Sequence, residues 1–163
     1  MATTHATHLP ALGAHQREEV GNLLQATVIE LTDLALVGKH LHWNVVGPHF
    51  RSLHLQLDEL IDSWRLLGDT VAERAVAVGF QPDGQSATVA GATEFATLDQ
   101  GAIEDHVVVR ELANRLATVS ENVRTRMDRL GELDGASEDV LTEVLRGLEE
   151  NLWMIRAQIP SGH

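Results

Sequence analysis

The chain of 163 residues contains no cysteine, a single lysine (Lys39) and no apolar run close to the about 20 residues that a membrane helix needs. Disulfides and thiolate metal sites are therefore excluded, so a metal site must use histidine, carboxylate or backbone oxygen. Residues 1–10 lack a basic segment followed by an apolar core, which argues against a signal peptide. We therefore expect a cytoplasmic protein, with nucleoid association as a further expectation.

Basic residues are scarce in general: 12 Lys and Arg stand against 24 Asp and Glu, for a formal net charge of −12. Such a surface repels nucleic acid and attracts cations, although solubility alone also explains it. The length allows one domain with a sizeable core rather than two.

Apolar residues recur at spacings of three and four, which predicts four long helices. Gly47-Pro48 ends the first helix, and Ser137 is a candidate cap for the last. The helices are expected at residues 15–45, 50–78, 101–130 and 137–159. They make up an all-α bundle over residues 13–160, between a flexible N-terminal tail (1–12) and a short C-terminal tail (161–163). Residues 80–100 form a long crossover, which makes the second and third helices parallel.

Five residues of metal-ligating type stand out on the first two helices. They are His42, His54, Asp58, Asp69 and Glu73. The second helix carries two pairs with a spacing of four, so the members of each pair share a face, and eleven residues separate the pairs, close to three turns. At 1.5 Å per residue, however, roughly 28 Å separates the outermost members of the set, so one chain cannot close a site with both pairs.

A two-fold axis beside Ser63 and Trp64 resolves this difficulty. In two antiparallel copies of the helix, His54 faces the partner's Glu73 and Asp58 faces the partner's Asp69. Each dimer would then hold two equivalent sites about 22 Å apart. Since the turn folds the first helix back onto the second, His42 is expected to reach His54 of its own chain. Solvated carboxylates and packed histidines remain the simpler alternative for each residue taken singly.

Three segments resemble the Dps family of miniferritins. They are Lys39 to Phe50, His54-Leu-Gln-Leu-Asp58-Glu59 and Asp69-Thr-Val-Ala-Glu73-Arg74-Ala75, and the five ligand positions match that family without insertion. The resemblance covers nearly the whole chain. It implies a ferritin-like bundle, a hollow homododecamer, and a ferroxidase site at each two-fold interface. It further implies that ferrous iron is oxidised, preferably by hydrogen peroxide rather than oxygen, and stored inside the cage.

The same resemblance suggests that Trp43 and Trp153 intercept stray oxidising equivalents, with plain apolar packing as the alternative. Trp64, near the proposed axis, is expected to pack at the interface. Glu121 and Asp128, seven residues apart, are candidates for an iron-entry pore, although solvated helix charge is equally plausible. The histidines His5, His8 and His15 are better explained as incidental residues of a mobile tail than as a second metal site.

Two features of the sequence restrict which functions are expected. No glutamate is followed by histidine three positions later, which disfavours a di-iron site within one bundle. The tail has no Lys or Arg before Arg17, so direct DNA binding is expected to be weak or absent near neutral pH. A non-enzymatic protective shell and a plain helical interaction module remain as alternatives.

Overall fold

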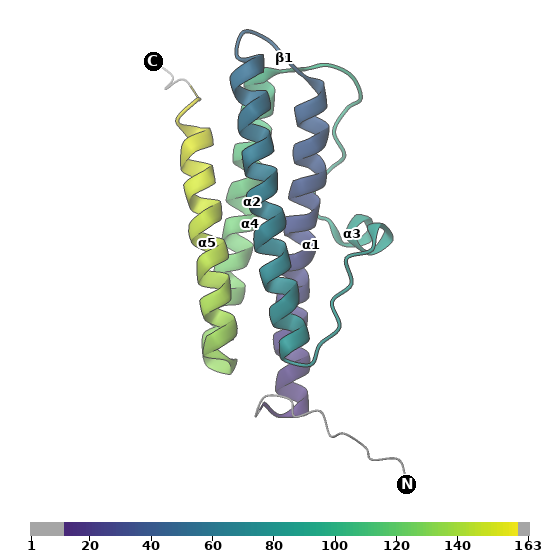
Figure 1. The fold of residues 1–163 in the computed structure, drawn as a ribbon, viewed down its shortest axis with the longest axis vertical. Helices are drawn as coiled ribbons and strands as arrows, with labels where there is room; N and C mark the ends of the chain where they lie inside the picture. Colours follow the sequence, from purple (N-terminus) through teal and green to yellow (C-terminus); the bar gives the residue numbers. More distant parts are fainter. Residues whose placement is uncertain (1–11, 160–163) are drawn as a thin grey trace.

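The computed structural model describes residues 12–159 and consists almost entirely of helices (Figure 1). Four long helices form the bundle, and a short fifth lies in the crossover. Their bounds are α1 (Ala14–Asn44), α2 (Phe50–Ala77), α3 (Ser86–Ala92), α4 (Asp105–Leu133) and α5 (Gly135–Arg156). The predicted tails lie outside the described residues except for Leu12, and so do His5 and His8.

The order of the helices in space confirms the predicted crossover. α1 packs antiparallel to α2, and α4 packs antiparallel to α5. The segment between α2 and α4 returns along the length of the bundle and carries α3 on its way, so α2 and α4 run in the same direction (Figure 1). Two consecutive helices of a bundle can run in the same direction only if a long connection joins them.

The start of α4 differs from the sequence prediction. α4 begins at Asp105, because Ile103–Glu104 form a short strand (β2) that pairs in parallel with Val45–Val46 (β1). This pairing joins the end of the crossover to the turn between α1 and α2. A two-residue strand has no alternation that the sequence could reveal.

The cap predicted at Ser137 is wrong. α5 begins at Gly135, with Asp134 as the only residue between it and α4. Ser137 lies buried inside the first turn, where its hydroxyl donates to Asp134 Oδ2 at 2.5 Å and accepts from Arg74 Nε at 2.9 Å. The serine therefore ties the α4–α5 turn to the end of α2.

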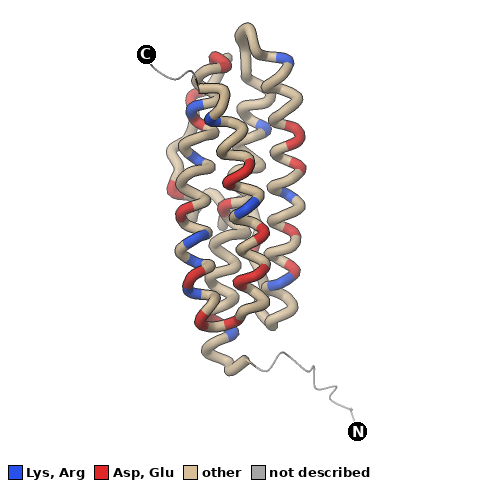
Figure 2. Tube along the Cα trace, turned by 90° about the vertical axis from the view of Figure 1, so that its left-hand side faces the viewer, with Lys and Arg blue, Asp and Glu red and all other residues tan. Residues whose placement is uncertain are grey.

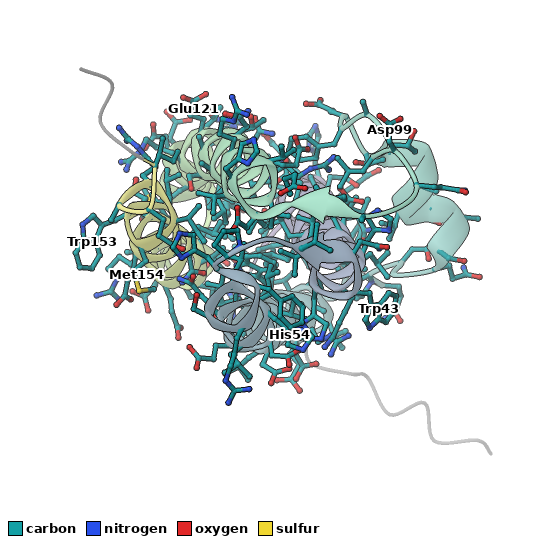
Figure 3. All side chains as sticks on the ribbon, turned by 90° about the horizontal axis from the view of Figure 1, so that it is seen from above. Trp43, His54, Asp99, Glu121, Trp153 and Met154 are labelled. Atoms are coloured by element: carbon teal, nitrogen blue, oxygen red, sulfur yellow. The ribbon has the colours of Figure 1, made fainter. Side chains whose placement is uncertain are left out.

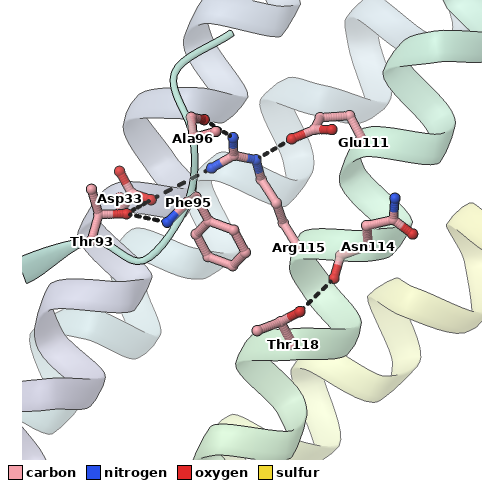
Figure 4. Close-up of polar contacts among 8 residues, drawn as sticks. All are labelled: Asp33, Thr93, Phe95, Ala96, Glu111, Asn114, Arg115 and Thr118. Atoms are coloured by element: carbon pink, nitrogen blue, oxygen red, sulfur yellow. Dashed lines mark hydrogen bonds and ion pairs between the residues drawn. The ribbon is translucent and has the colours of Figure 1, made fainter.

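A buried arginine fixes the crossover to the bundle (Figure 4). The side chain of Arg115 on α4 is 3% exposed; its Nη2 donates to Ala96 O at 2.8 Å, and its Nε donates to Glu111 at 2.6 Å. Asp33 of α1 lies 3.7 Å away, and the guanidinium stacks 4.5 Å from the centre of the Phe95 ring. A buried charge is tolerated only when it is paired in this way, so the network sets the path of the crossover.

Trp64 lies in the bundle core, which corrects the prediction that it packs at an interface between chains. It is fully buried, and its Nε1 donates to Asn151 Oδ1 of α5 at 3.0 Å. It follows Leu57 and Ile61 on the inward stripe of α2, which lies roughly 100° around the helix from the candidate ligands.

Helix α1 is long and apolar enough to cross a membrane by length and composition alone, contrary to the expectation from its sequence. Half of that apolar window is buried inside the bundle. Burial against the neighbouring helices therefore accounts for its composition.

Truncation of the central tryptophan should destabilise the bundle. We expect Trp64→Ala to lower the free energy of unfolding by about 3–5 kcal/mol, because the change leaves a cavity and an unpaired Asn151. Urea unfolding followed by circular dichroism measures this value. Val76→Ala, on the same helix at a site that is 52% exposed, should cost about 0.5 kcal/mol or less. Equal losses in the two variants would contradict the core position of Trp64.

Candidate metal centre

Two histidines face each other where α1 turns back into α2. His42 lies in the last turn of α1, and His54 lies in the second turn of α2. Their rings stack with centroids 3.7 Å apart and planes 21° apart, and His42 is buried. The predicted contact between these residues within one chain is therefore confirmed.

The two rings hold each other through reciprocal hydrogen bonds to the backbone. His42 Nδ1 lies 2.9 Å from His54 O, and His54 Nδ1 lies 3.0 Å from His42 O. A carbonyl oxygen only accepts, so each Nδ1 must be the protonated nitrogen of the ring. In a neutral imidazole with this tautomer, Nε2 carries the lone pair that binds a metal ion.

Asp58 completes the part of the site that one chain supplies. It lies one turn after His54 on α2, and its Oδ1 is 3.5 Å from His42 Nδ1. The same oxygen accepts from Lys39 Nζ of α1 at 2.5 Å. This hydrogen bond is the main cause that holds the pKa of Asp58 below its usual value, so the carboxylate is ionised at neutral pH.

Asp105, the first residue of α4, holds the turn that brings the histidines together. Its carboxylate accepts from His49 N at 2.8 Å and from His106 N at 2.7 Å, and the first of these bonds is the main cause that lowers its pKa. Gly47 has φ +124°, and a Cβ there would meet the Asp105 carboxyl at 2.8 Å. Only glycine fits this turn, for both reasons.

Asp69 and Glu73 lie on the same helix but do not reach this group. Both are exposed, and α2 is continuous from Phe50 to Ala77, so the spacing predicted along its axis holds. Asp69 lies beside a groove of about 520 Å³ between α1 and α2, together with Lys39 and Trp43. Within one chain three of the five predicted residues lie near the turn, where His42 contacts both His54 and Asp58, and the other two stand apart.

Comparison with known proteins identifies the family. The family model for a ferritin-like domain matches residues 21–161. A DNA protection during starvation protein of Mycolicibacterium smegmatis is 33% identical over 94% of this chain and 84% of its own length. The fine tangled pili major subunit of Haemophilus ducreyi is also 33% identical, over 95% of this chain and 82% of its own length. The structure of Dps from Microbacterium arborescens in the high iron form aligns with a TM-score of 0.87 and 28% identity, over 93% of this chain and 99% of that one.

The chain belongs to the Dps family of ferritin-like proteins. Membership implies iron binding and protection from oxidative damage. The predicted fold class, a ferritin-like four-helix bundle, is thereby confirmed.

The two tryptophans predicted to lie near the site are exposed at opposite sides of the Dps chain (Figure 3). Trp43 at the end of α1 is 73% exposed, and Trp153 on α5 is 68% exposed. Neither side chain is therefore packed in the core of a single chain.

The other predicted residues lie away from the histidine pair. Glu121 and Asp128 are both exposed on α4, two turns apart, and no described contact assigns them to a pore. His15 is exposed in the first turn of α1.

Sequence reasoning missed two residues of the site. Lys39 precedes His42 by three positions on α1, a spacing that places both on one face and could have indicated its role. Asp105 stands at the start of an apolar-periodic helix, a common place for an acidic residue, and nothing in the sequence links it to a turn 56 residues away.

Asp105 also belongs to a second cluster. Among residues 12–159, the only three metal-ligating side chains whose donor atoms all lie within 4.8 Å of one another are Glu104, Asp105 and His106. Both carboxylate oxygens of Asp105 already accept backbone N–H groups, and the positive end of α4 disfavours a cation there. Asp105 therefore serves to hold the turn and the first turn of α4.

The role of Asp105 predicts a pH dependence. Its pKa in the folded Dps chain is lowered, so its contribution to stability is present above the unfolded pKa of about 3.9 and is lost as the pH falls through the folded value. Asp105→Asn should therefore flatten the fall in urea midpoint between about pH 5 and pH 2. Asp62→Asn, whose side chain is 80% exposed, is the matched control and should leave the wild-type slope. A wild-type slope in Asp105→Asn would contradict the role of Asp105 in holding the turn.

Proposed function

We propose that this protein oxidises ferrous iron at sites shared between two copies of itself and stores the ferric product in a hollow cage of twelve chains. Iron is the substrate and the cargo, and hydrogen peroxide is preferred over oxygen as oxidant. The observation that carries the proposal is the reciprocal bond pattern of His42 and His54, which leaves two Nε2 atoms free beside an ionised Asp58.

The donor set suits this chemistry. Imidazole nitrogen and carboxylate oxygen bind first-row divalent metals, and carboxylates stabilise the ferric form, which makes loss of an electron easier. Two ferrous ions supply the two electrons that reduce one peroxide to two water molecules with two protons, so no hydroxyl radical need be released. The high iron form described for the Microbacterium arborescens Dps supports iron as the substrate.

A two-fold dimer would complete the site. Asp69 and Glu73 of one chain would face Asp58 and His54 of the other when two α2 helices lie antiparallel, with the axis beside Ser63. The groove between α1 and α2 and the exposed Leu36 (56%) and Leu66 (68%) lie on these two helices, which supports them as the contact surface. Exposed leucines of this kind gain stability when a partner buries them.

The remaining assignments belong to the same proposal. Trp43 and Trp153 are candidate traps for stray oxidising equivalents, and Glu121 and Asp128 are candidate pore residues. Figure 2 shows acidic and basic positions intermingled along the bundle. Together with the net charge of −12, this pattern supports protection of the cell by removal of iron and peroxide rather than by direct DNA contact.

Loss of the ligands should abolish oxidation. Anaerobic titration of the assembled protein with ferrous iron, followed by hydrogen peroxide, should give fast oxidation that saturates at about two iron ions per site. The double variant His54→Ala with Asp58→Ala should lose the fast phase. Asp62→Ala, on the same helix with an 80% exposed side chain, is the control and should retain it. Equal rates in the ligand variant and the wild type would reject the site.

Mixing two inactive variants tests whether the site is shared. One variant carries His54→Ala and Asp58→Ala, and the other carries Asp69→Ala and Glu73→Ala. A mixed dimer has one site with all defects and one intact site, so a random equal mixture, co-assembled from unfolded chains, should recover about a quarter of the wild-type activity. Each variant refolded alone serves as the control. Absence of recovery in mixtures shown by mass spectrometry to contain mixed assemblies would place the complete site within one chain.

A further inference from the structure

The only lysine of the chain contacts the candidate metal centre. Lys39 Nζ lies 2.5 Å from Asp58 Oδ1, and the two side chains are 27% and 44% exposed. Every other positive side chain is arginine. The nearest comparison is Arg65 in the same groove. Within residues 12–159 it forms one ion pair, with Asp62, which spans 3.9 Å between two largely exposed side chains.

The ion pair adds little to the fold of one chain, because an ion pair that is partly exposed to solvent contributes little to stability. Its position matters more at the proposed dimer site. There the partner's Asp69 and Glu73 approach Asp58, and carboxylates brought together repel one another unless a cation lies among them. An ammonium on a flexible stem provides a compact positive charge that can also move away.

We propose that Lys39 is a built-in competitor for the iron site: it neutralises Asp58 when no iron is bound and must leave that carboxylate when iron binds. This inference rests on the proposed function. The two cations would share the carboxylate of Asp58, whose Oδ1 lies against the ammonium. A metal ion bound about 2 Å from Oδ1 would lie less than about 5 Å from the ammonium in its present position, where two positive charges repel strongly.

Competition of this kind lowers the affinity of the site for metal and sets a threshold for loading. The iron ion next to Asp58 bears the cost of displacing the ammonium, whereas an ion held mainly by the two Nε2 atoms does not. The site should therefore load in two steps of unequal affinity, and Lys39 should affect the weaker step.

Calorimetric titration of the assembled protein with cobalt(II) under anaerobic conditions tests the inference without any oxidation step. Lys39→Met should tighten the weaker binding step roughly five- to tenfold, because it removes an ion pair and a repulsive charge. Lys39→Arg keeps the charge and should bind cobalt no more tightly than the wild type. Arg65→Met is the matched control, since it removes one positive charge from the same groove without touching Asp58, and its affinity should stay within about twofold of the wild type.

Four results would overturn the inference. Weaker binding in Lys39→Met would mean that the lysine positions the carboxylate for metal, and equal gains in Lys39→Met and Arg65→Met would mean that general charge is responsible. Suppose that the His54→Ala, Asp58→Ala variant loses cobalt binding but Lys39→Met gains no affinity. That result would reject competition by Lys39 and leave the proposed function intact. If that double variant binds cobalt as the wild type does, the proposed function fails and the inference fails with it.

Discussion

The turn between α1 and α2 is the constraint on which the candidate site depends. His42 and His54 each use one ring nitrogen to bind the other's backbone carbonyl, so neither ring can rotate without breaking a hydrogen bond at a largely buried position. This pattern fixes the tautomer as well as the orientation. Structural bonds at Nδ1 thereby determine which nitrogen is free for metal.

Contacts from distant parts of the chain hold this turn. Asp105 anchors it from the start of α4, and the β1–β2 pairing joins it to the end of the crossover. The crossover is in turn fixed by Arg115, which bonds to Ala96 and packs against Phe95 (Figure 4). The long connection that makes α2 and α4 parallel thus also supports the end of the bundle where the histidines meet.

Two faces of α2 have different roles. Trp64, Leu57 and Ile61 fill the core, and Trp64 also bonds to Asn151 across the bundle. A neighbouring face carries the ligand pairs, three turns apart on a helix that has no break. A rigid helix keeps the two pairs at a constant separation, which the proposed two-fold dimer requires, and Lys39 from α1 balances the charge at one of them.

The sequence by itself determined the four long helices, the crossover and the meeting of His42 with His54, because helical periodicity and the Gly47-Pro48 turn are local properties of the chain. It misplaced Trp64 because a tryptophan near a supposed axis looks the same whether it faces a partner or the core. Only the tertiary structure decided which ring nitrogens are free, that Lys39 forms an ion pair with Asp58, and that Asp105 holds the turn. These features depend on atoms from different helices, between 12 and 56 residues apart along the chain, and no local pattern records such contacts.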